Sequence, residues 1–207
     1  MNNRGSIAIT GVILLTSVIL IGVVATSVLS SETEEISEKD VEEILDDTLN
    51  EITTYLKITD KLGKYYGVHH QQKIEKIAIM VKPLISTDID ISELTVKLCD
   101  GNTVKILSFN GNADFIGSQS LFEHSLWDDL PEGTFGFIVT HDKDNSLVDY
   151  NIINKNTDMA YIVIKLSEEL SLEKGETLIV TLFPESGIQR TIKVEAPMPM
   201  KSIISFE

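Results

Sequence analysis

The sequence predicts an α+β protein, in which a long N-terminal hydrophobic helix precedes a globular antiparallel β-sandwich (Ig-like) domain. Residues 6–29 contain no charged side chain and are long enough for a helix that crosses the hydrocarbon core of a membrane. Beyond residue 50, short runs of alternating apolar and polar residues recur between turn-forming residues, as in a sandwich of short strands. We therefore expect a leader (1–5), a long helix (6–50) and an outer β-sandwich (51–207).

The helix is predicted in two parts. Its uncharged part, 6–29, has no polar stripe, so it needs an apolar environment on every side. Arg4 precedes this part and an acidic stretch that begins at Glu32 follows it, which predicts a cytoplasmic N-terminus. From residue 32 to 50, apolar residues recur every three or four positions, so the helix is expected to continue with one apolar stripe.

Three interpretations of the apolar segment stay open. It could be a single-pass membrane anchor, or a secretory signal peptide with the small residues 25–27 at its cleavage site. The third is a class III signal, in which a membrane peptidase cuts between Gly5 and Ser6 and the helix stays on the mature protein. Arg4 and Gly5, placed directly before the apolar segment, favour the third interpretation.

The charge balance argues against nucleic-acid binding. The chain carries 17 Lys and Arg against 32 Asp and Glu, for a net charge of −15, whereas nucleic-acid binding needs clustered basic residues. A strongly acidic surface stays soluble by self-repulsion and attracts cations. Cys99 is the only cysteine, so no intrachain disulfide can form and the fold depends on packing.

The strand pattern begins near Ile52. Asp100-Gly101, between two alternating runs, is typical of a hairpin turn, residues 110–132 are expected to form a polar loop, and residues 142–146 a turn. Strands are predicted over residues 52–59, 76–82, 94–98, 103–109, 135–139, 147–153, 160–166, 177–183 and 190–194.

The sequence gives little support for catalysis. His69 and His70 are adjacent, so in an extended chain they would point to opposite sides and form no ready metal pair. His124 and His141 have no nucleophile or acid at a motif spacing, and Cys99 is expected to be a small buried hydrophobe. We predict no catalytic residue and no required cofactor.

One acidic turn is a candidate cation site. It places oxygen ligands at Asp142, Asp144, Ser146 and Asp149 within eight residues. Ca²⁺ prefers about six to eight oxygen ligands, and alternate acids in a turn supply several. A structural Ca²⁺ or another divalent cation is therefore the ligand class that this turn would take, with a solvated acidic turn as the alternative.

Together, these features resemble the archaellin family, the type IV pilin-like subunits of the archaeal swimming filament. The match spans nearly the whole chain, and its most specific part is a C-terminal hairpin with Pro184-Glu185-Ser186-Gly187 at its turn. The segments that carry the resemblance are 4–29, 76–83, 88–91, 95–101, 142–149, 180–187 and 191–197.

The resemblance implies a structural subunit of the archaellum, an extracellular filament used for swimming. The expected partners are the cell membrane before assembly, a prepilin-type signal peptidase, an assembly platform with its ATPase, and copies of the same chain or related archaellins. Some family members bind a metal in the outer domain. The helix would leave lipid for a bundle of identical helices, where small residues allow close packing. The residues expected to matter for polymerisation are Ala8, Gly11, Leu20, Gly22 and Ala25.

Other functions share parts of this pattern. An archaeal adhesion pilin would use the same machinery, and cleavage after Gly5 places Thr10 where a bacterial pilin carries Glu, which favours the archaeal branch. A membrane-anchored sandwich of the motor, of the stator kind, is a second alternative. A secreted carbohydrate-binding module is a third. Fold alone does not separate them.

Overall fold

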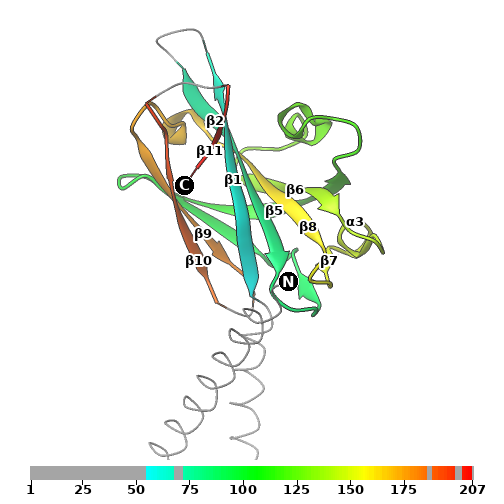
Figure 1. The fold of residues 1–207 in the computed structure, drawn as a ribbon. Helices are drawn as coiled ribbons and strands as arrows, with labels where there is room; N and C mark the ends of the chain where they lie inside the picture. The colour runs from blue at the N-terminus through cyan, green and yellow to red at the C-terminus, as the bar shows by residue number, and fades with distance from the viewer. Residues whose placement is uncertain (1–54, 68–71, 186–187, 199–201, 207) are drawn as a thin grey trace, which may run out of the picture. The chain divides into compact units, whose positions relative to one another are not determined.

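The computed structural model describes residues 55–67, 72–185, 188–198 and 202–206 (Figure 1). All of them belong to one compact unit, Leu45–Glu207. The predicted leader, the predicted helix over 6–50 and the boundary after it lie outside the described residues, as do His69 and His70. Among the described residues, no helix is long and apolar enough to cross a membrane.

The described residues are mostly β-strand, as their alternating pattern predicts. Every strand predicted within them overlaps an observed one, although the segment 147–153, discussed below, does so only at its last two residues. The strands are β1 (Leu56–Tyr66), β2 (Lys73–Pro83), β3 (Ile89–Asp90), β4 (Thr95–Cys99), β5 (Val104–Phe115), β6 (Thr134–His141), β7 (Ile152–Ile153), β8 (Met159–Lys165), β9 (Thr177–Phe183), β10 (Arg190–Glu195) and β11 (Ile203–Ser205).

The strand topology differs from the predicted antiparallel sandwich of two sheets. Nine strands form one continuous sheet in the order β10-β9-β4-β5-β6-β8-β2-β1-β11, and β3 pairs with β7 beside it. The sheet is mixed, because β5 and β6 run parallel while the other described pairs are antiparallel. Parallel neighbours need a crossover of a dozen or more residues, and residues 116–133 provide it.

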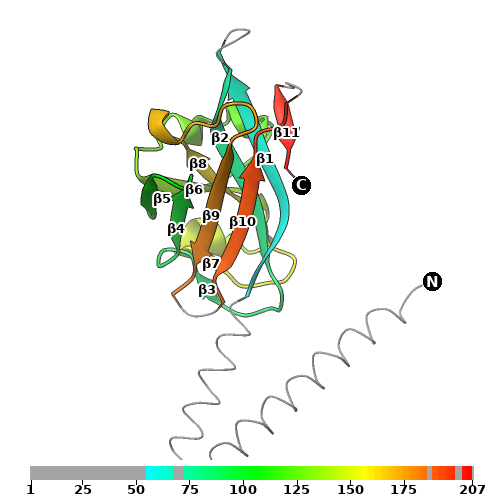
Figure 2. The same cartoon turned by 90° about the vertical axis from the view of Figure 1, so that its left-hand side faces the viewer.

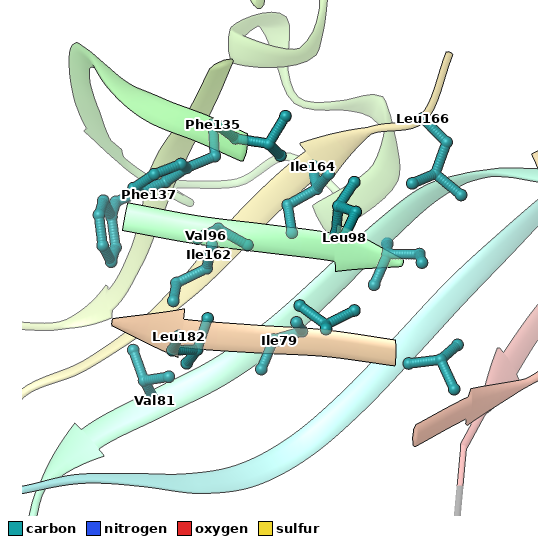
Figure 3. Packing of buried hydrophobic residues seen from close by; sticks show 14 of the residues in the cluster. Ile79, Val81, Val96, Leu98, Phe135, Phe137, Ile162, Ile164, Leu166 and Leu182 are labelled. Carbon is teal, nitrogen blue, oxygen red and sulfur yellow. The ribbon is translucent and has the colours of Figure 1, made fainter. Parts of the chain in front are cut away.

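The continuous sheet curls so that its two halves face each other, which gives sandwich-like packing without two separate sheets (Figures 1 and 2). Figure 3 shows Val96 and Leu98 of β4 packed over Ile162 and Ile164 of β8, which belong to the same buried cluster. We call this concave side the inner face of the sheet and the opposite side its outer face. Because β4 exposes only its outer side to water, its residues alternate between buried and half-buried.

A second, smaller core lies on the outer face over β2, β6 and β8. The crossover 116–133, named here the covering segment, contains two 3-10 helices, Leu121–Glu123 and Ser125–Trp127. The prediction of a polar loop over 110–132 was therefore wrong: its first residues extend β5, and much of the rest packs on the sheet. The buried members of this cluster are Ala78, Phe122, Leu126, Trp127, Leu130, Ile138, Tyr161 and Val163.

The predicted strand over 147–153 was also wrong for most of its length. Residues Ser146–Tyr150 form the one-turn helix α3, and only Ile152 and Ile153 pair, with β3. Asn145 and Asn151 flank the helix with φ of 58° and 60°. Asn tolerates this left-handed conformation better than most residues, so the two asparagines stop the strand on both sides.

The end of the described chain adds a strand that the sequence analysis missed. β11 pairs with β1 through only three residues, with Gly63 opposite Ile204. A Cβ atom on Gly63 would lie 2.5 Å from the ring of Phe206, so the absence of a side chain at this position makes room for the ring. Tyr65 Oη also donates a hydrogen bond to the carbonyl oxygen of Pro197 (3.0 Å).

Candidate functional site

The sheet brings together three carboxylates at one end of β6 and β8. Asp142 follows β6 directly, Asp144 lies in the next turn, and Asp158 directly precedes β8. His141 pairs with Met159, so the end of β6 lies beside the start of β8. One carboxylate oxygen from each of the three aspartates lies within 4.8 Å of the others. We call Asp142, Asp144 and Asp158 the acidic cluster.

Backbone amides hold two members of the acidic cluster in place. Asp142 accepts hydrogen bonds from the amides of Leu147 (2.9 Å) and Asp144 (3.3 Å). Asp158 Oδ2 accepts hydrogen bonds from the amides of Lys155 (2.8 Å) and Asn154 (3.3 Å). The turns on both sides of the cluster are therefore fixed by the carboxylates that they surround.

One oxygen of the cluster has no partner among the described residues. Asp158 is fully buried, and its Oδ1 atom makes no hydrogen bond. The Oδ1 atom of Asn154 is likewise buried without a hydrogen-bond partner. A buried polar oxygen without a hydrogen bond costs about 1–3 kcal/mol, and more when it is charged. A cation beside Asp158 would remove this penalty.

The members of the cluster differ in their electrostatic environment. Burial raises the pKa of Asp142, because the charged carboxylate loses contact with water. The hydrogen bond from Lys155 Nζ holds the pKa of Asp144 well below its usual range, and Asp144 raises the pKa of Lys155 in return. Asn154 Nδ2 donates a second hydrogen bond to Asp144 (3.2 Å). The ammonium group of Lys155 pairs with Asp144, and one positive charge against three carboxylates leaves the cluster negative when all of them are ionised.

The predicted ligand set overlaps the acidic cluster in two residues. Asp142 and Asp144 belong to it, whereas the hydroxyl of Ser146 donates to the carbonyl oxygen of Ile152 (2.8 Å) and Asp149 lies exposed on α3. Sequence reasoning missed Asp158, which is 14 residues beyond Asp144. Only the pairing of β6 with β8 brings Asp158 close to the other two aspartates, and the sequence pattern does not contain this pairing.

The other residues considered in the sequence analysis do not belong to the acidic cluster. His124 is buried in the covering segment, where its Nδ1 atom accepts a hydrogen bond from the amide of Leu126 (3.2 Å) and its Nε2 atom lies 3.0 Å from the carbonyl oxygen of Phe115. Cys99 was expected to be buried but is half-buried, on the outer face of β4. The predicted processing and polymerisation residues lie outside the described residues: Arg4, Gly5, Ser6, Ala8, Gly11, Leu20, Gly22 and Ala25.

Comparisons with known proteins agree over almost the whole chain. The family Archaeal-type flagellin matches residues 5–194. Flagellin B3 of Methanocaldococcus jannaschii is 25% identical over 203 residues, which cover 95% of this chain and 92% of that protein. Flagellin B3 of Thermococcus kodakarensis is 26% identical over 222 aligned positions, covering 93% and 85% of the two chains.

Two solved structures share the fold. Archaeal flagellin FlaB1 of Methanocaldococcus jannaschii superimposes with a TM-score of 0.63 at 21% identity, covering 73% of this chain and 95% of that one. The archaeal flagellum of Methanospirillum hungatei strain JF1 gives a TM-score of 0.53 at 9% identity, covering 99% and 98%. The chain belongs to the archaeal-type flagellin family, and it is an archaellin: a structural, non-enzymatic subunit of the archaeal flagellum filament.

Proposed function

We propose that this archaellin polymerises through its N-terminal apolar segment. The observation that carries the proposal is the uncharged run 6–29 in a chain that otherwise has a strongly acidic composition. Such a segment is stable in lipid or in a bundle of like helices, and the transfer between them needs little hydrophobic free energy. Packing at small residues such as Gly11 and Gly22 then decides the association, and a repeated contact that does not close produces a helical filament.

The precursor waits in the cell membrane until a prepilin-type peptidase removes residues 1–5. An assembly platform and its ATPase then add the mature subunit, alone or together with related archaellins, to the extracellular filament. Mass spectrometry of subunits from purified filaments tests this step. We expect an N-terminus at Ser6 and, for Gly5→Val, an uncut precursor in the membrane fraction. Subunits that retain Met1 in the filament would contradict the proposal.

A charge placed in the apolar segment tests polymerisation separately from processing. Leu20→Lys costs about 2.5–3.5 kcal/mol on insertion at mid-membrane and leaves an unpaired charge in a packed bundle. We expect no filaments from this variant while the β domain stays folded, as checked by circular dichroism in detergent. Lys57→Glu, which changes a charge at an exposed position, is the matched control and should assemble. Normal filaments from Leu20→Lys would exclude a buried segment.

We also propose that the acidic cluster holds a structural Ca²⁺ or another divalent cation. The support is the buried, partnerless Oδ1 atom of Asp158 within reach of two further carboxylates. Subunits dissociated in detergent provide the test, with melting followed by calorimetry. Chelation should lower the melting temperature by about 5–10 °C relative to Ca²⁺ at about 100 times its Kd.

Two aspartate variants separate this cation site from a solvated acidic turn. Asp158→Asn should remove the response to chelator and to added Ca²⁺, because the buried ligand is lost. Asp149→Asn, an exposed neighbour on α3, should keep the full response. A wild-type melting curve that chelator leaves unchanged would end the cation proposal.

A further inference from the structure

The outer face of the sheet is covered over one half only. Over β2, β6 and β8, the covering segment buries the apolar side chains of the outer face. Over β4, β5 and β9, apolar side chains on the same face remain exposed: Val104 by 54%, Ile106 by 69% and Ile179 by 41%. Alternate residues of β4 and β9, and Leu107 of β5, are buried in the large core on the opposite face, so the exposed side chains of these strands cannot turn inward.

Strand register makes these side chains one continuous surface. Cys99 of β4 lies opposite Val104 of β5 and opposite Ile179 of β9, so the three form one row across the sheet. In the next row, Lys97 lies opposite Ile106. Directly opposed side chains on one face touch. We name Lys97, Cys99, Val104, Ile106 and Ile179 the outer patch.

The single charge in the outer patch indicates what covers it. Lys97 makes no salt bridge within the described part of the chain, although the chain has a net charge of −15. Lys97 lies between Ile106 of β5 and Thr181 of β9, and its unpaired ammonium group beside the apolar patch suits a partner surface that is both apolar and acidic. Another copy of this chain has the required acidic character, and filament growth places such copies side by side.

We propose that the outer patch is a contact surface between neighbouring subunits of the filament. The occupant is a second copy of this chain, which covers the apolar rows and pairs a carboxylate with Lys97. The contact is heterologous, because in a helical filament the patch of one subunit meets a different surface of the next. The proposal rests on assembly of this chain into filaments and adds a contact in the β domain to the one proposed for the helix.

The native cysteine tests the proposal without any mutation. Cys99 is the only thiol in the chain and lies in the middle of the outer patch. We expect a maleimide to react with Cys99 at least about tenfold more slowly in intact filaments than in subunits dissociated in detergent, because the contact must open first. Equal rates in both states would overturn the patch contact while leaving filament assembly intact.

A more exposed thiol is needed if Cys99 reacts slowly both in filaments and in dissociated subunits. In a Cys99→Ser background, Ile106→Cys places a thiol at the most exposed position of the patch, and Ile203→Cys places one on β11 as the matched control. The thiol at position 106 should lose reactivity on assembly by a larger factor than the thiol at 203. Equal factors would overturn the proposal, and failure of the wild-type chain to form filaments would instead overturn the proposed assembly.

Lys97→Glu tests the charge pairing directly. The substitution places a negative charge against the acidic neighbour, so filaments of this variant should dissociate at a lower temperature than wild-type filaments. Added salt should narrow the difference, since it screens the new repulsion. Lys57→Glu is the control, because Lys57 is an exposed lysine on β1, outside the outer patch, and like Lys97 makes no salt bridge within the described part of the chain. Wild-type stability of Lys97→Glu filaments would exclude Lys97 from the contact.

Discussion

The two halves of the curled sheet share one inner core but differ on their outer faces. Over β6 and β8, both faces are buried, and these strands contain nearly continuous runs of buried residues. Over β4 and β5, only the inner face is buried, and burial alternates or is sparse. We refer to them as the covered half and the open half. The covering segment of the chain thus buries the outer face of one half, whereas the outer face of the other half is the surface that we propose a neighbouring subunit covers.

The strongest test of this comparison removes Trp127 from the covering segment. Trp127 is 1% exposed, stacks on Phe122 with ring centroids 5.8 Å apart, and donates a hydrogen bond from Nε1 to the carbonyl oxygen of Leu121 (2.7 Å). Trp127→Ala should lower the free energy of unfolding of the subunit by about 3–5 kcal/mol in urea titrations. A loss below about 1 kcal/mol would mean that the covering segment contributes little to the domain.

Gly136 tests how closely the covering segment approaches the sheet. A Cβ atom at Gly136 would lie 2.8 Å from Leu126 Cδ2 and 3.1 Å from the carbonyl oxygen of Asn112. Gly136→Ala should therefore destabilise the subunit by about 1–3 kcal/mol through overpacking. Ser108→Ala, an exposed position on β5 in the open half, is the control and should change the same free energy by less than about 0.5 kcal/mol.

Tyr161, on the outer face of the covered half, predicts a loss of stability at high pH. Burial, together with Asp60 at 3.4 Å, raises its pKa to about 12 from the usual value of 10.0. Between these values the folded state keeps a proton that the unfolded state loses. The free energy of unfolding should therefore fall by about 2 kcal/mol as the pH rises through this window, and Tyr161 should cause no pH dependence of stability below it.

Urea unfolding at about pH 9 and pH 11.5 measures this decline. Tyr161→Phe should remove most of it, whereas Tyr150→Phe, at a position 71% exposed, should leave it unchanged. An identical alkaline decline in wild type and Tyr161→Phe would show that Tyr161 loses its proton as easily in the folded state as in the unfolded chain.

The smallest expected effect is on the open half. Ile106→Thr should change the free energy of unfolding of the isolated subunit by less than about 0.5 kcal/mol, because Ile106 is already 69% exposed. The same variant should lower the dissociation temperature of filaments. A loss of more than about 2 kcal/mol in the subunit would show that the two halves do not differ in the way described here.

The sequence predicted the strands better than their arrangement. Alternation is a local signal, so β4 and β9 were predicted almost residue by residue. The parallel pairing of β5 with β6 depends on how a long crossover packs, and the polar Asn110-Gly111-Asn112, which lie within β5, indicated a loop instead. The buried Phe122 and Trp127 that anchor the crossover have no regular period, so nothing local marked them as core.

The candidate cation site was also predictable only in its local part. Asp142 and Asp144 are two residues apart, and a turn brings them close whatever the remaining fold is. Asp158 reaches them only because His141 pairs with Met159, a tertiary contact that the local pattern does not contain. Asp149 was selected by proximity in sequence, but α3 turns it outward, and that helix depends on the left-handed conformations of Asn145 and Asn151.

The two edge strands of the sheet oppose aggregation of the subunits at the high local concentration that a filament creates. One edge is β11, whose three paired residues are too few to template an added chain, and the other is β10, which carries Arg190, Lys193 and Glu195. Short edge strands and charged edges both oppose the strand addition that leads to cross-β fibrils. We therefore expect order in the filament to come from contacts between side-chain surfaces and not from strands added to the edges of this sheet.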